Sequence, residues 1–187
     1  MSRTLRHLLT VLLAVTAVAL PVVAATAPTP VPVAATSCDT PWGSTGERVD
    51  AQGRPPLTAV RTGRHDCFDR VVFDLGGPAA GYRVEYVDEV TQDGSGTVVD
   101  VPGGARLLVA VHHPAYDDTT GTPTIVPPPT AGRPVADVGG YDTLRSVVYA
   151  GSFEGSTTFG VGVRARLPFR VFVEGSKVVV DVAHRWT

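Results

Sequence analysis

Apolar and polar residues alternate with a period of two in many segments of the chain. In "RVVFDL" (70–75), Val71, Phe73 and Leu75 face one side of an extended strand, while Arg70 and Asp74 face the other. No long window shows apolar residues at the 3.6-residue period of a helix. The 20 glycines and 16 prolines recur throughout and would interrupt helices. The pattern therefore predicts β-strands.

Further strands are expected where short alternating segments lie between turn signals such as "GG", "DGSG" and "PGG". The segment "TFGVGVRAR" (158–166) places Phe159, Val161 and Val163 on one face, and its glycines, Arg164 and Arg166 on the other. The other candidates are Leu57–Arg61, Tyr82–Val90, Thr97–Val101, Arg106–His112 and Leu144–Tyr149.

"FRVFVEGSKVVVDV" (169–182) reads as two strands joined by a two-residue turn at Gly175 and Ser176, where glycine first suits a type II′ turn. In total we expect eight to nine strands without crossover helices. This predicts an all-β fold, a β-sandwich of two packed, mainly antiparallel sheets. The segment 112–134 does not alternate and predicts a long surface loop, held extended by Pro127–Pro129.

Two strands share one order of residues: "RVVFDLGG" (70–77) and "KVVVDVAH" (177–184) each begin with a basic residue and reach an aspartate after three apolar ones. A sandwich of two similar sheets would use one such central strand in each sheet. The alternative is that the outward charged residues form a binding face. Val71, Phe73, Leu75, Val178, Val180 and Val182 should be buried, and Arg70, Asp74, Lys177 and Asp181 should point into solvent.

The N-terminus has the layout of a secretory signal. Arg3 and Arg6 precede the apolar stretch Leu8–Leu20, and small residues end at Ala25. The alternative is an uncleaved membrane anchor, but the stretch is short for a span and Pro21 interrupts it. We expect a signal peptide over 1–25, a Pro/Ala/Thr-rich linker over 26–37 and one folded domain over 38–187, with no stable membrane insertion after cleavage.

Charge and cysteine content refine this picture. Loss of Arg3 and Arg6 would reduce the 16 basic side chains by two, against 18 acidic ones, so a nucleic-acid partner is not expected. The two cysteines, Cys38 and Cys67, predict one disulfide in an exported chain. Such a link contributes roughly 3–4 kcal/mol of stability. A reactive thiol two residues after His65 is the alternative.

The segment "AVRTGRHDCFDRVVFDLGG" (59–77) resembles the opening of AMIN-type domains of bacterial cell-envelope proteins. In "LRSVVYAGSFEGSTTFGVGVRARLPFRVFVEGSKVVVDV" (144–182), the parts "GSFEG", "TFGVGV", "PFRV" and "VVVDV" are similar to the closing half of the AMIN-like variant. That variant occurs in secreted and lipid-anchored proteins. The resemblance implies a β-sandwich and a non-catalytic role in the cell envelope, and it offers no catalytic residues to carry over.

The best metal-binding candidate is "HHPAYDD" (112–118), because imidazole and carboxylate groups suit zinc or a harder divalent ion. Adjacent histidines on a strand point to opposite faces, however, so they cannot easily share one ion. We therefore expect no metal, no cofactor and no enzyme activity. The alternative is a secreted hydrolase with a site near His112, Asp117 and Asp118.

Outward aromatic and basic residues are the candidates for ligand binding. Trp42 and several tyrosines could stack on sugar rings, and arginines could pair with carboxylates. The sequence thus favours a secreted, cell-envelope-associated, non-catalytic domain that binds peptidoglycan or an envelope protein; a purely structural exported domain is the other alternative. The candidate binding residues are Arg70, Asp74, Arg164, Arg166, Lys177 and Asp181.

Overall fold

The computed structural model describes residues 38–187, so the expected signal peptide and linker lie outside the described residues. This part of the chain folds as β-strands without helices, which confirms the all-β prediction. None of its segments is a helix long and apolar enough to cross a membrane. The strands are β1 (Glu47–Val49), β2 (Leu57–Arg64), β3 (Phe68–Leu75), β4 (Tyr82–Val87), β5 (Val90–Thr91), β6 (Val98–Val99), β7 (Ala105–Val111), β8 (Arg133–Pro134), β9 (Leu144–Phe153), β10 (Ser156–Val163), β11 (Phe169–Glu174) and β12 (Lys177–Ala183).

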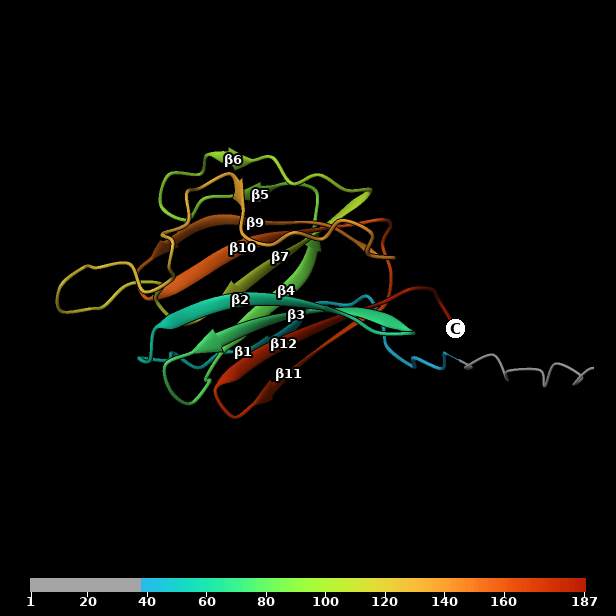
Figure 1. Ribbon diagram of the computed structural model, residues 1–187, viewed down its shortest axis with the longest axis horizontal. Helices are drawn as coiled ribbons and strands as arrows, with labels where there is room; N and C mark the ends of the chain where they lie inside the picture. Colours follow the sequence, from blue (N-terminus) through green and yellow to red (C-terminus); the bar gives the residue numbers. More distant parts are fainter. Residues whose placement is uncertain (1–37) are drawn as a thin grey trace, which may run out of the picture. The chain divides into compact units, whose positions relative to one another are not determined.

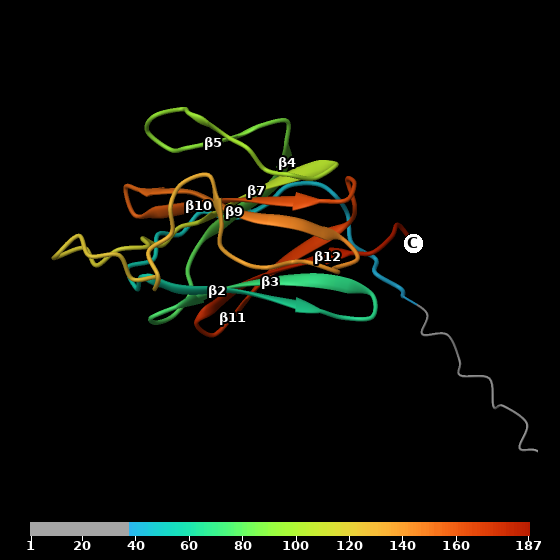
Figure 2. The ribbon, with the colours of Figure 1, turned by 45° about the horizontal axis from the view of Figure 1, so that its top comes forward.

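Two antiparallel sheets pack face to face (Figures 1 and 2). The larger has the order β1-β4-β7-β10-β9-β8, and the smaller has the order β11-β12-β3-β2. A two-stranded sheet, β5-β6, lies beyond the larger sheet, on the side away from the smaller one (Figure 1). Twelve strands therefore replace the predicted eight to nine. The additional ones include β1 and β8, which are too short to show alternation.

The core lies between the two main sheets and is built from their inward-facing residues. Phe73 on β3 and Phe159 on β10 meet across the interface, with ring centroids 5.0 Å apart. The predicted burial of the alternating residues is confirmed, because all six are at most 6% exposed. Each such side chain contributes about 1.5–3 kcal/mol when fully buried. The six are Val71, Phe73, Leu75, Val178, Val180 and Val182.

The two similar strands occupy central positions, as predicted, but in one sheet rather than one in each. β3 and β12 are direct antiparallel neighbours in the four-stranded sheet. Their register places Arg70 opposite Asp181 and Lys177 opposite Asp74. Every basic residue of the repeated pattern thus faces an acidic one, so the pattern is complementary to itself in the antiparallel direction.

The predicted turn between β11 and β12 is confirmed. Gly175 has φ 58°, whereas Ser176 is not among the residues with positive φ, as a type II′ turn requires. The segment 112–134 differs from the expected surface loop, because His113, Ala115 and Ile125 are buried. Ala115 and Ile125 belong to the main hydrophobic core.

The glycines of "TFGVGV" have a packing role that alternation alone does not show. A Cβ atom on Gly160 would lie 2.3 Å from a methyl of Val101, and one on Gly162 would lie 1.9 Å from the Pro102 carbonyl oxygen. The backbone before β7 therefore crosses β10 at close range. β10 ends at Val163, so Arg164 and Arg166 lie in the connection to β11 rather than on a strand.

Candidate binding face on the four-stranded sheet

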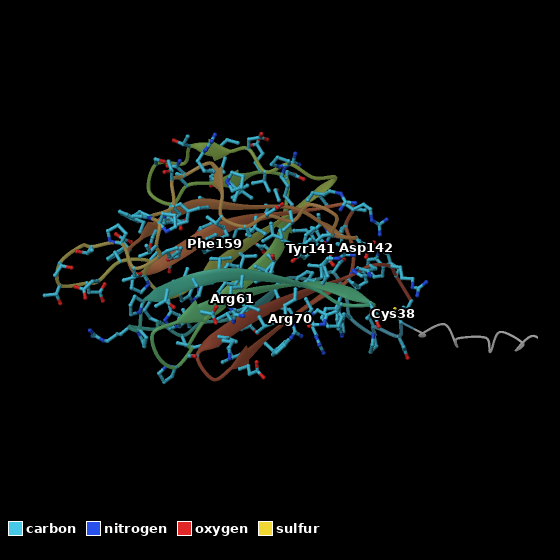
Figure 3. The ribbon with its side chains drawn as sticks, in the orientation of Figure 1. Cys38, Arg61, Arg70, Tyr141, Asp142 and Phe159 are labelled. Atoms are coloured by element: carbon cyan, nitrogen blue, oxygen red, sulfur yellow. A yellow bond between two sulfur atoms is a disulfide. The ribbon has the colours of Figure 1, made fainter. Side chains whose placement is uncertain are left out.

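Asp181 is the central polar residue on the outer face of the four-stranded sheet. Arg70 donates from Nε to one carboxylate oxygen at 2.6 Å and from Nη2 to the other at 2.9 Å. Arg170 donates to the carboxylate from Nε at 2.9 Å. The three residues are aligned across β3, β12 and β11, because both arginines pair with Asp181 in register. Figure 3 shows Arg70 on this sheet.

The expectation that Asp181 is solvated is wrong: its side chain is 0% exposed, although it lies on the outer face. Two guanidinium groups cover it, and they also supply the hydrogen bonds that a buried carboxylate needs. The hydrogen bond to Asp181 raises the pKa of Arg70, so this arginine remains charged. Two positive charges against one negative leave the cluster with a net charge of +1.

Aromatic rings surround the two guanidinium groups. The Cζ atom of Arg170 lies 4.4 Å from the ring centroid of Trp42 and 5.1 Å from that of Phe172. The Cζ atom of Arg70 lies 5.3 Å from the ring of Phe68. These are cation–π distances, and such contacts hold a guanidinium in a fixed orientation. We name this surface the arginine–aromatic face; it comprises Trp42, Phe68, Arg70, Arg170, Phe172 and Asp181.

The disulfide positions Trp42 on this face. Cys38 and Cys67 are joined, as predicted, with their Cα atoms 5.2 Å apart. Cys67 directly precedes β3, so the link fastens the segment containing Trp42 to the start of that strand. The carbonyl oxygen of Gly43 also accepts a hydrogen bond of 2.8 Å from the Phe169 N–H. The indole contacts the ring of Phe68 edge to face at 5.6 Å.

Four of the six predicted binding residues share this outer face. Asp74 and Lys177 lie opposite each other, two pairs along from Val72 and Val179 in the register and therefore on the same face. Asp74 accepts a hydrogen bond of 2.8 Å from Arg61 Nη2. The structure therefore brings Arg70, Asp74, Lys177 and Asp181 together on two neighbouring strands.

Arg164 and Arg166 lie outside the sheet, in the β10–β11 connection. Arg164 donates a hydrogen bond of 2.5 Å to the carbonyl oxygen of His184. Arg166 donates one of 3.0 Å to the carbonyl oxygen of Ser44, and its guanidinium lies 4.9 Å from the ring centroid of Tyr86. Both side chains tie loops together.

The predicted metal-binding segment does not form a cluster. Asp117 closes its own turn by accepting hydrogen bonds from Thr119 and Thr120, and the Thr120 N–H is the main cause of its lowered pKa. Within residues 38–187, His112, Asp117 and Asp118 do not come together as a group of metal-ligand type.

His113 has a structural role beside this segment. The side chain is fully buried, and burial lowers its pKa, so the imidazole is neutral. Its Nδ1–H donates to the carbonyl oxygen of Pro55 at 2.7 Å, and its Nε2 accepts from the Ala80 N–H at 2.9 Å. Both ring nitrogens are thus occupied by the backbone.

A cluster with the donor types of a metal site lies elsewhere, and the sequence analysis missed it. It consists of Asp69, Asp142 and His184, whose donor atoms all lie within 4.8 Å of one another. A signal for it exists in the sequence. Asp69 precedes Val71 by two residues and His184 follows Val182 by two, so alternation directs both polar residues to the inner side of the sheet.

Neither the curated proteins nor the solved structures contain a match to this chain. The family model of the AMIN-like domain matches residues 55–184, from the residues just before β2 to the residue after β12. This range covers more than half of the chain and every strand of the two main sheets except β1. It agrees with the resemblance of the motifs and with the all-β fold. AMIN-like domains are generally non-catalytic and are associated with the bacterial cell envelope. The chain belongs to the AMIN-like domain family.

Proposed function

We propose that this chain is an exported, non-catalytic cell-envelope domain that binds peptidoglycan through the arginine–aromatic face. The observation that carries the proposal is the exposure of this cationic cluster: the side chain of Arg170 is 42% exposed and that of Arg70 is 25% exposed. Membership of the AMIN-like family, the signal-like N-terminus and the disulfide support an envelope location.

The chemistry of the face suits this ligand. A guanidinium has five N–H donors in a fixed fork, and Asp181 engages the Nε and Nη2 atoms of both Arg70 and Arg170. The remaining N–H groups can donate to the carboxylates of peptide stems. The half-buried rings of Trp42 and Phe172 offer apolar surface beside these donors, which suits the apolar faces of sugar rings. Asp181 holds both arginines in place before the ligand arrives, so little ordering entropy is lost on binding.

Cosedimentation with purified cell-wall sacculi tests the proposal. We expect the purified chain to be retained and Arg170→Ala to weaken retention by about tenfold, which corresponds to the loss of one strong charged contact. Arg170→Ala leaves the bidentate bond between Arg70 and Asp181 in place, so the variant should fold. Arg133→Ala is the matched control, since it removes the same charge from the exposed strand β8 of the other sheet.

Equal retention of the wild type, Arg170→Ala and Arg133→Ala would refute the arginine–aromatic face as the binding surface. If the wild type is not retained by sacculi but is captured by an envelope protein after cross-linking in cells, the peptidoglycan proposal is wrong and a protein partner replaces it. Release of soluble fragments from the sacculi would contradict the non-catalytic assignment and revive the hydrolase alternative.

A further inference from the structure

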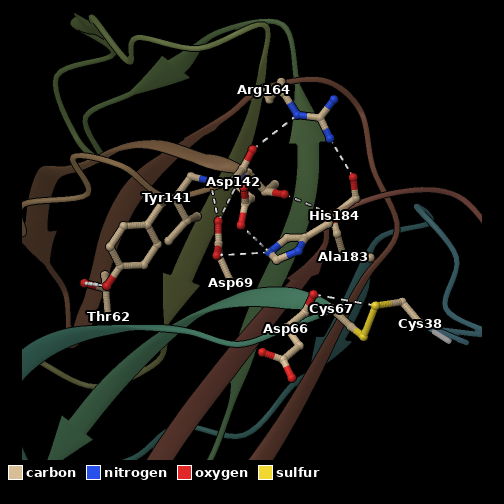
Figure 4. A network of polar contacts seen from close by, with 12 residues as sticks. Cys38, Thr62, Asp66, Cys67, Asp69, Tyr141, Asp142, Arg164, Ala183 and His184 are labelled. Atoms are coloured by element: carbon tan, nitrogen blue, oxygen red, sulfur yellow. Dashed lines mark hydrogen bonds and ion pairs between the residues drawn. A yellow bond between two sulfur atoms is a disulfide. The ribbon is translucent and has the colours of Figure 1, made fainter. Parts of the chain in front are cut away.

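Three side chains from separate parts of the chain converge at one end of the sandwich (Figure 4). Asp69 lies near the start of β3, Asp142 lies just before β9, and His184 directly follows β12. Among residues 38–187 this is the sole group of three or more metal-ligating side chains. It lies near the Cys38–Cys67 disulfide (Figure 4).

The separations of the donor atoms suit a single ion. His184 Nε2 lies 3.1 Å from Asp69 Oδ1 and 3.9 Å from Asp142 Oδ2. Ligand atoms bound at about 2.0–2.2 Å to one zinc ion lie roughly 3–3.5 Å from one another. The first pair already has this spacing. The second needs a small rotation of Asp142, whose side chain is 64% exposed and therefore free to move.

The backbone around the cluster fixes two of the three donors. Asp69 Oδ2 accepts hydrogen bonds from the N–H groups of Thr143 at 2.6 Å and Leu144 at 3.0 Å, which leaves Oδ1 directed at His184. The His184 N–H donates to the Cys67 carbonyl oxygen at 2.9 Å. Such hydrogen bonds orient the ligands before an ion binds.

Arg164 also stabilises the arrangement of the cluster. Its guanidinium donates to the backbone carbonyl oxygens of Asp142, at 3.3 Å, and of His184, at 2.5 Å. It therefore holds the two ligand-bearing segments near each other. Neither of these bonds involves the Asp142 carboxylate, which leaves that carboxylate available as a ligand.

The burial of Asp69 and the space beside the cluster also suit a bound ion. Asp69 is fully buried, and two backbone N–H groups occupy its Oδ2, so Oδ1 is the oxygen that faces His184. The cluster borders a hollow of about 450 Å³, whose lining includes Asp66, Asp142, Arg164, His184 and Arg185. Water in this hollow could complete the coordination.

We propose that Asp69, Asp142 and His184 bind one divalent transition-metal ion, with zinc as the preferred ion because one imidazole and two carboxylates match its donor preferences. The ion would fasten His184, directly after β12, and the loop before β9 to the start of β3. Its role is a structural clamp, and it is independent of ligand binding at the arginine–aromatic face.

Isothermal titration of the chain with ZnCl₂ tests the proposal. The protein should carry no histidine tag and should be dialysed against a chelator first. We expect one equivalent of zinc to bind. At a zinc concentration 100 times the Kd, the melting temperature should rise by about 5–10 °C, since binding to the folded state stabilises it.

Asp142→Ala is the informative variant, because its exposed side chain can be removed without disturbing the core. We expect the variant to bind zinc at least about tenfold more weakly. Asp66→Ala, which removes an exposed acid from the same hollow, is the control and should bind as the wild type does. Absence of zinc binding to the wild type below about 100 µM, or equal affinity of Asp142→Ala and the wild type, would overturn the proposal.

Discussion

The two faces of the β3–β12 pair follow different rules. On the inner face, Val71, Phe73, Val178 and Val180 are all fully buried against the other sheet. On the outer face, Asp181 is buried because Arg70 covers it together with Arg170 of β11. The inner face requires only that apolar residues alternate along each strand, since any apolar residue of suitable size can fill the core. The outer face also requires the correct register between strands, because each charged side chain needs an oppositely charged partner.

This difference explains why the chain carries the same strand twice. Each copy places a basic residue four positions before an aspartate, so antiparallel pairing sets unlike charges opposite each other: Arg70 faces Asp181, and Lys177 faces Asp74. Parallel pairing would set Arg70 beside Lys177 and the two aspartates beside each other. Cross-strand pairs of like charge are destabilising, so the repeat helps to select both direction and register.

The largest effect is expected on the inner face. Phe73→Ala should lower the free energy of unfolding by about 3–5 kcal/mol, because it leaves a cavity against Phe159. Phe172→Ala on the outer face of β11 is the matched comparison and should cost less than half as much, since that ring is only partly buried. Urea unfolding of both variants measures the difference. Equal losses would show that the outer face packs as densely as the core.

The next effect is expected at Asp181. Asp181→Asn removes the charge that holds two arginines and should cost about 1.5–3 kcal/mol, the range for hydrogen bonds to charged groups. For the same reason, charge reversal at Arg70 should lower the melting temperature, which a solvated arginine would not do. Thermal unfolding monitored by circular dichroism checks both variants. A melting temperature of Asp181→Asn within about 1 °C of the wild type would contradict this account of the burial.

Alternation in the sequence predicted which face each residue of the repeated strands occupies, but not what covers that face. Alternation places Asp181 on the outer face of the sheet, but the side chain is buried because Arg70 and Arg170 lie over it. Arg170 is contributed by the hairpin partner and Arg70 by a strand 111 residues away in the chain. The two-residue alternation of a strand does not indicate which strands lie beside it. These partners are known only when the strand order and register of the sheet are known.

The cluster of Asp69 and His184 was missed for a related reason. Asp69 and His184 continue the alternation of their strands on the side that faces the core. Extending that alternation by two residues at each strand would therefore have predicted two polar side chains directed inward. Asp142 carries no such signal, since it lies in a loop whose position depends on tertiary packing. The tight approach of the segment before β7 to Gly160 is likewise visible only once the sheets are assembled.

The smallest effect is expected at Asp74, the counterpart of Asp181 in the other copy of the repeat. Its side chain is 21% exposed and its partner Arg61 is 56% exposed, so solvent screens the ion pair. Asp74→Ala should therefore cost at most about 1 kcal/mol, and 0.5 M NaCl should reduce that cost further. Urea unfolding at low and high salt measures both quantities. The two aspartates share one sequence context but differ in the side chains that shield them from solvent. Two arginines and a nearby indole lie over Asp181, whereas one exposed arginine contacts Asp74. If Asp74→Ala proved as costly as Asp181→Asn, these shielding side chains would not determine the stability, and the strand pairing itself would have to stabilise both carboxylates equally.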